Sequence, residues 1–191
     1  MHALKTLIAI VGLLITSGWA YAQELKTEPT LDETLRWISD NIDGFTVSAK
    51  SGNRVVTQSV HGVAINSCNI VLQDVQHDET NEVAGGNIVD EHEREYRIPV
   101  GRLRPPTTST AGWGPLGGEA PVLFLATEAE AIRMHYTNVH RGSSRIVTPS
   151  TSSSDQTVST VGIFSKDVDL VNRMQKAFSR AITLCKAKEL F

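Results

Sequence analysis

The C-terminal segment 165–187 constrains the fold more than any other part of the chain, because its pattern predicts an amphipathic helix that needs a surface to lie on. Asp167 and Asp169 put negative charge in the first turn, where the helix dipole favours it, and Ser165 offers an N-cap oxygen. Apolar residues then recur at three- and four-residue steps: Leu170, Met174, Phe178, Ala181, Ile182 and Cys185. A stripe this wide packs on a sheet or on another helix. We therefore expect a C-terminal helix over about 166–187, packed on the rest of the domain.

The N-terminal segment 1–22 has the pattern of a cleaved signal peptide. A short basic start precedes an apolar run over 7–15, and Ala20 and Ala22 supply the small residues of a signal peptidase site. The run is too short to span a bilayer comfortably. We therefore predict cleavage after Ala22, a polar tether over 23–29, export to the periplasm or the extracellular space, and no membrane span after cleavage.

The charge of the chain limits the classes of partner that it can bind. The formal net charge is −3, and removal of the signal peptide takes away one lysine, so the mature chain is mildly acidic. It has no basic run, which argues against nucleic acid and against anionic membrane surfaces as partners. The expected partner is an unknown protein or a small ligand, and no cofactor is expected.

Two cysteines, Cys68 and Cys185, remain after cleavage of the signal peptide. Export places them in an oxidising compartment, where two cysteines are the smallest number that can pair. Cys68 lies in a strand-like run and Cys185 on the apolar stripe of the last helix. We predict a disulfide that ties this helix to the sheet; the alternative is two buried free thiols.

A capping box predicts a further helix near the start of the mature chain. Thr30 supplies the N-cap, and Glu33 lies three residues later, where its carboxylate can reach back to the amide of Thr30. Apolar residues follow at helical spacing, with Trp37 beside them, and Gly44 ends the pattern. We expect this helix over about 30–43.

Between the two helices the chain alternates with a period of two, which is typical of half-buried strands. Tyr96 and Ile98, for example, face one way while their neighbours are polar. Segments 104–121 and 141–156 are rich in Ser and Thr, the first also in Pro and Gly, and we predict both as long loops. Short connections favour an antiparallel sheet. The expected fold class is α+β: a curved antiparallel sheet or partly open barrel of six or seven strands, in one domain over 30–191 with a helix near each end.

Four short motifs carry a family resemblance: the helix start 30–38, the strand 67–70, the segment 98–103, and the closing pattern 173–185. Through them the chain resembles a type of small exported bacterial domain with no assigned activity. The order of elements is also similar to pleckstrin-homology-like barrels, in which a C-terminal helix closes a curved antiparallel sheet. That resemblance implies the fold alone, because the long N-terminal helix and the acidic net charge depart from the phosphoinositide-binding pattern.

One acidic stretch contains candidate metal ligands: His77, Asp78, Glu79, Asp90 and His92. Carboxylate oxygens and imidazole nitrogens suit several divalent ions. The spacing, however, lacks the two-histidine helix motif of zinc peptidases and the alternating aspartates of an EF-hand. A solvated loop is therefore the favoured interpretation, and a metal-dependent periplasmic hydrolase that uses His77 and His92 is the alternative.

Trp113 is the candidate for partner binding, because it lies among glycines in the predicted loop 104–121. An exposed tryptophan on such a loop can anchor a partner; alternatively, it folds back and covers an open end of the sheet. The function favoured by the sequence is an exported, non-enzymatic domain that binds through its long loops. The hydrolase and a structural component of the cell envelope are the alternatives.

Overall fold

The fold is α+β, as predicted, with two sheets and a helix near each end of the domain. The computed structural model describes residues 28–82, 86–114, 116–142 and 149–188. The helices are α1 (Leu31–Ile42), α2 (Val168–Lys188) and the short 3-10 helix η1 (Val100–Arg102). The strands are β1 (Thr46–Ser51), β2 (Arg54–Asn66), β3 (Asn69–Glu82), β4 (Gly86–Pro99), β5 (Thr107–Trp113), β6 (Gly118–Ala126), β7 (Ile132–Gly142), β8 (Ser150–Val158) and β9 (Thr160–Phe164).

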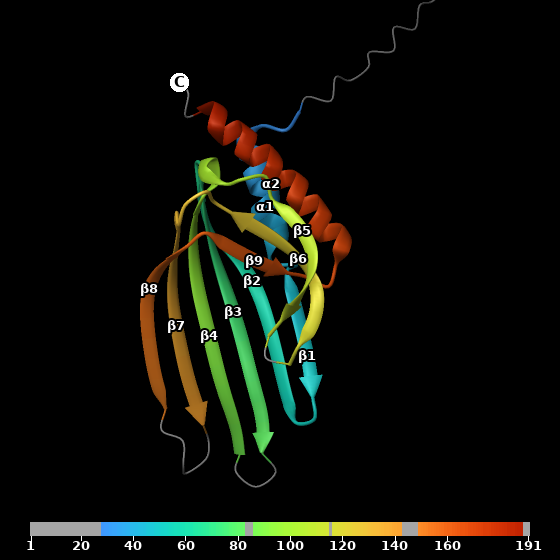
Figure 1. The fold of residues 1–191 in the computed structure, drawn as a ribbon, viewed down its shortest axis with the longest axis vertical. Helices are drawn as coiled ribbons and strands as arrows, with labels where there is room; N and C mark the ends of the chain where they lie inside the picture. Colours follow the sequence, from blue (N-terminus) through green and yellow to red (C-terminus); the bar gives the residue numbers. More distant parts are fainter. Residues whose placement is uncertain (1–27, 83–85, 115, 143–148, 189–191) are drawn as a thin grey trace, which may run out of the picture.

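The strands form a large sheet in the order β1-β2-β3-β4-β7-β8 and a small sheet in the order β5-β6-β9. Every pair of neighbouring strands is antiparallel, and the sheets are not closed into a barrel. In Figure 1 the two helices lie together at one end of the molecule, and the long strands of the large sheet run from there to the other end.

The described residues contain nine strands, more than the six or seven expected, because both predicted loops contain strands. Most of 104–121 is a hairpin of β5 and β6, whose turn uses Gly114 and Gly117 at φ values of 63° and 69°. The prolines and glycines of this segment favour a loop, but its β-branched threonines suit a strand. In 141–156, β8 is exposed along nearly its whole length, so no buried residue marks it. Its pairing with β7 depends on backbone hydrogen bonds. Residues 143–148 lie outside the described residues.

The main core lies between the helices and the two sheets, at the helical end of the strands. Ile70 and Leu72 of β3 and Ile98 of β4 are fully buried there. Helix α2 contributes the predicted stripe, and the buried members of that stripe are Leu170, Met174, Phe178, Ala181, Ile182 and Cys185. The prediction that this helix packs its apolar side on the sheet is therefore confirmed.

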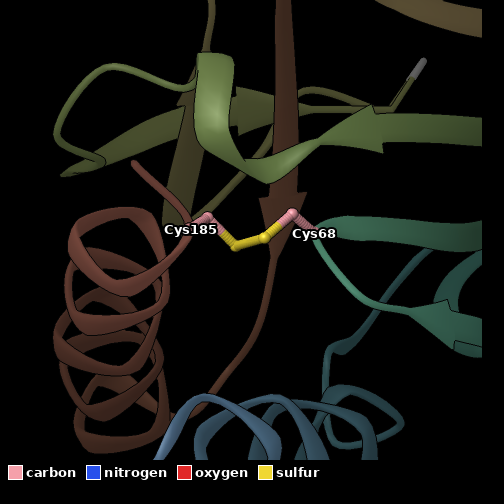
Figure 2. The surroundings of a disulfide bond; sticks show 2 residues. All are labelled: Cys68 and Cys185. Atoms are coloured by element: carbon pink, nitrogen blue, oxygen red, sulfur yellow. A yellow bond between two sulfur atoms is a disulfide. The ribbon is translucent and has the colours of Figure 1, made fainter. Parts of the chain in front are cut away.

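A disulfide between Cys68 and Cys185 joins the turn before β3 to the last turns of α2, as predicted (Figure 2). The two Cα atoms lie 5.7 Å apart, and 117 residues separate the cysteines in sequence. A cross-link over so long a loop removes much conformational entropy from the unfolded chain. The disulfide therefore stabilises the contact between the last helix and the large sheet.

The helix starts are set by local hydrogen bonds. The capping box of α1 is complete: the Glu33 amide donates to Thr30 Oγ1 (3.3 Å), and the Thr30 amide donates to Glu33 Oε2 (2.8 Å). Helix α2 begins slightly later than the sequence predicts, because Asp167 Oδ1, and not Ser165, accepts the hydrogen bond from the Leu170 amide (2.9 Å). Ser165 Oγ accepts instead from the Asp167 amide (3.1 Å).

No helix in the described part of the chain is long and apolar enough to cross a membrane. The predicted signal peptide 1–22 and most of the tether 23–29 lie outside the described residues.

Candidate functional site

The inner face of the large sheet changes from apolar to polar along the strands. On β3, Ile70 and Leu72 face the core, and the alternation continues with Asp74, Gln76 and Asp78 on the same face. The neighbouring strands bring further polar residues beside them. We call this set the polar face; it consists of Arg54, Gln58, Asp74, Gln76, Asp78, Asp90, His92, Arg94, Tyr136, Asn138 and His140.

Asp74 is the most deeply buried carboxylate of the polar face, with 5% of its surface exposed. Gln58 Nε2 donates to both of its oxygens (2.9 and 3.0 Å), and Arg94 Nη1 donates to Oδ2 (3.1 Å). Burial raises the pKa of Asp74, and the hydrogen bonds from Gln58 and the charge of Arg94 oppose that rise. Burial also raises the pKa of the adjacent Tyr96 to about 12, with a smaller contribution from the charge of Asp74.

Asp78 and Asp90 lie directly opposite each other on β3 and β4, and each has a basic partner on the next strand outward. Arg54 on β2 binds Asp78 through Nε (2.8 Å) and Nη2, and this hydrogen bonding raises the pKa of Arg54. His140 Nδ1 on β7 contacts Asp90 Oδ1. The two like charges are thus each held by a separate partner, which reduces their mutual repulsion.

Tyr136 lies between an imidazole and a guanidinium. Its hydroxyl is 2.8 Å from His92 Nδ1, and the two rings are stacked with their centroids 6.1 Å apart. The guanidinium carbon of Arg94 lies 5.8 Å from the Tyr136 ring centroid, at the distance of a cation–π contact. These contacts hold the three side chains in a fixed arrangement across β4 and β7.

Asn138 lies opposite His92 in the register of β4 and β7, and its Oδ1 atom is buried. Within the described residues this oxygen has no hydrogen-bond partner. A buried acceptor without a donor costs about 1–3 kcal/mol. Such an atom in a native structure requires an explanation, and a donor group on a ligand is one.

The polar face remains accessible enough to bind a ligand. The side chains of Arg94, Asp90 and His140 are 25%, 34% and 29% exposed, although their polar atoms are paired within the face. The arrangement therefore presents hydrogen-bonding groups that are both ordered and accessible.

The five candidate metal ligands are divided between the two faces of the sheet, because successive residues of a strand point in opposite directions. Asp78, Asp90 and His92 belong to the polar face, whereas His77 and Glu79 lie on the outer face. The favoured interpretation of this stretch as a loop was wrong, since it lies on β3 and β4. In the described part of the chain, no group of three or more His, Cys, Asp and Glu side chains is arranged to hold a metal ion.

Trp113 is buried, with 6% of its surface exposed, so its ring is not available as an exposed anchor for a partner. It packs against Val47, Val56 and Ala120 in a second, smaller hydrophobic cluster between the β5–β6 hairpin and strands β1 and β2. The alternative, in which the tryptophan folds back onto the sheet, describes this position. The reason is that the segment forms the regularly paired β5–β6 hairpin and is not a free loop.

Sequence reasoning missed most of the polar face. The sequence pattern does not single out His140, Tyr136, Arg94 or Asn138. The signal was present in the period-two alternation, because the positions that are apolar near one end of β3 and β4 continue in the same phase as polar ones. Only the register between strands shows that these polar positions face one another.

Comparison of the chain with protein-family models, with curated proteins and with solved structures gives no match. The resemblances to a small exported bacterial domain and to pleckstrin-homology-like barrels therefore stay predictions.

Proposed function

We propose that this protein is an exported, non-enzymatic binding domain whose polar face takes a small, uncharged ligand rich in hydroxyl groups, such as a sugar. One observation carries the proposal: the buried Asn138 Oδ1 has no partner among the described residues, although it lies within an ordered set of polar side chains. A ligand hydroxyl would donate to this oxygen and remove the cost of leaving it unpaired.

The charges of the polar face favour an uncharged ligand. Asp74 and Asp78 are paired with Arg94 and Arg54, and Asp90 is paired with His140. A strongly charged ligand would have to compete with these ion pairs. Amide, imidazole and phenol groups, in contrast, offer donors and acceptors that match hydroxyl groups.

Export is supported by the signal-peptide pattern and by the disulfide. Disulfides persist in oxidising compartments and are rare in the cytosol. The location in the periplasm or outside the cell is part of the proposal, and analysis of the mature N-terminus of the protein recovered from culture fractions tests it.

The metal-dependent hydrolase has weaker geometric support. Its two histidines, His77 and His92, lie on opposite faces of the sheet and cannot approach one ion together. A purely structural envelope component remains the outcome to be expected if the polar face binds no ligand.

The proposal is tested by titrating the isotope-labelled mature protein with a panel of neutral mono- and oligosaccharides and recording amide NMR shifts. We expect saturable shifts confined to β3, β4 and β7. Asn138→Ala should weaken binding about tenfold or more, because the ligand loses its partner for one hydroxyl.

The matched control is Thr137→Ala, the adjacent position on the outer face, where Thr137 lies opposite Glu93. This variant should bind as the wild type does. Equal weakening by both variants, or shifts located outside the three strands, would contradict the proposed site. The absence of any binding saccharide would contradict the proposed ligand class.

A further inference from the structure

A groove lies between α1 and α2, away from the polar face. It is a groove of about 630 Å³, within the range of roughly 300–1,000 Å³ that small-molecule sites occupy. Thr34, Trp37 and Ala177 supply its apolar surface, and Arg173, Lys176 and Arg180 of α2 supply a basic edge.

The apolar part of the groove is held in place by the core. Trp37 and Ala177 are partly buried and pack against the main hydrophobic cluster. The hydroxyl of Thr34 donates to the Thr30 carbonyl oxygen (2.8 Å), so this hydroxyl is already satisfied within the helix. The groove therefore offers a preformed apolar surface, which lowers the entropic cost of binding.

The basic edge carries more positive charge than its surroundings neutralise. In the described residues no carboxylate pairs with Arg173 or Lys176, and Arg180 pairs with Glu28 through Nη1. The Nε atom of Arg180 is buried and has no acceptor among the described residues. Arg180 lines the groove, and its unpaired donor requires an acceptor.

The single acidic residue that lines the groove does not supply that acceptor. Both the amide (2.8 Å) and the hydroxyl (2.9 Å) of Thr30 donate to Glu33 Oε2 in the capping box. The backbone hydrogen bond, followed by that from the hydroxyl, lowers the pKa of Glu33. Its carboxylate is therefore committed to the start of α1.

We propose that the groove binds a single-chain anionic amphiphile, namely a free fatty acid. The alkyl chain would lie against Trp37 and Ala177, where it buries apolar surface. The carboxylate would lie at the basic edge and accept a hydrogen bond from Arg180 Nε. This inference is independent of the function proposed for the polar face.

The test is a titration of the mature protein with sodium decanoate below its critical micelle concentration, followed by intrinsic fluorescence and by amide NMR shifts. After cleavage at the predicted site the tryptophans are Trp37 and Trp113. We expect a saturable change in emission that Trp37→Leu removes, and NMR shifts on α1 and α2. Decanol should bind at least several-fold more weakly, because it lacks the charge.

Charge variants separate the proposed site from general attraction to a basic helix. The double variant Arg173→Gln/Lys176→Gln should weaken decanoate binding by about tenfold, since each exposed charge contributes a modest interaction. Lys188→Gln on the same helix lies away from the residues that line the groove and is the matched control; it should bind as the wild type does.

Three outcomes of the binding titrations would overturn the inference. They are equal affinity for decanol and decanoate, equal weakening by Lys188→Gln and the double variant, and binding that does not saturate below the critical micelle concentration. All replaced cations lie on the solvent side of α2, so circular dichroism should show that the variants stay folded. NMR shifts on the polar face, with none on the helices, would assign decanoate to the other site and would also overturn the inference.

Discussion

The two ends of the inner face of the large sheet lie on the same strands and carry opposite chemistry. Near the helices, Leu72 is fully buried in the main apolar cluster. Two residues further along the strand and on the same face, Asp74 is also buried but is held by Gln58 and Arg94. Alternation along the strand decides which face a residue occupies, and the elements packed over that face decide which chemistry is stable there.

The helical end of this face supports the fold, and the polar end is available to bind a ligand. Burial of apolar surface stabilises the helical end directly. At the polar end the ion pairs and hydrogen bonds largely offset the cost of desolvation, so they contribute little net stability. Substitutions at the helical end should therefore lower stability strongly, and substitutions at the polar end should mainly alter binding.

The largest effect is expected from removing the disulfide at the helical end. Cys68→Ala/Cys185→Ala should lower the free energy of unfolding by about 4–5 kcal/mol, because the bond closes a loop of 117 residues in the unfolded chain. Urea unfolding of the oxidised wild type and of the double variant measures it. A loss below about 1 kcal/mol would show that the helical end needs no cross-link.

The next effect is a cavity in the apolar cluster. Phe178 on α2 is fully buried, and Phe178→Ala should cost about 3–5 kcal/mol. The comparison is Gln76→Ala on the polar face, which should change stability by no more than about 0.5–1 kcal/mol. Chemical denaturation of both variants measures the contrast. Equal losses of stability would contradict the conclusion that the helical end supports the fold more than the polar end does.

A pH-dependent effect follows from the raised pKa of Asp74. In the folded protein this carboxyl keeps its proton to a higher pH than in the unfolded chain, where the pKa is near 3.8. Wild-type stability therefore includes a contribution that is present below pH 3.8 and is lost as the pH rises through the raised value. The variant Asp74→Asn has no carboxyl at this position and does not undergo this loss. Its free energy of unfolding should therefore rise relative to that of the wild type as the pH increases across that range.

Unfolding curves recorded at several pH values from below 3.8 to neutrality test this prediction. Asp40→Asn, at an exposed position on α1, controls for the loss of one negative charge. The free energy of unfolding of Asp74→Asn, taken relative to the wild type, could instead stay constant or fall as the pH rises. That result would show that burial does not dominate the pKa of Asp74.

The smallest effect on stability is expected at the proposed ligand contact. Asn138→Ala removes a buried acceptor that has no partner in the described structure, so stability should be unchanged or should rise by about 1 kcal/mol. The same variant should lose saccharide binding. Thermal unfolding measures the first effect, and a clear loss of stability would show that Asn138 supports the fold instead of a ligand.

Several features could be predicted from the sequence because their causes are local. Thr30 and Glu33 form a capping box within one helical turn, and the stripe through Phe178 follows from helical spacing alone. The disulfide could be predicted because the chain has two cysteines and a secretory signal pattern. The β5–β6 hairpin was missed because Pro and Gly obscured its strand pattern, and β8 was missed because neither of its faces is buried.

The α+β class, both helices and the disulfide follow from the sequence alone, since each depends on spacing within one segment or on the number of cysteines. Tertiary contacts set the burial of Trp113, the division of the acidic stretch between two faces, and the position of Asn138 opposite His92. The physical reason is that strand register brings together residues from distant segments. A period of two identifies the residues that share a face of one strand, but it does not identify their neighbours on the next strand.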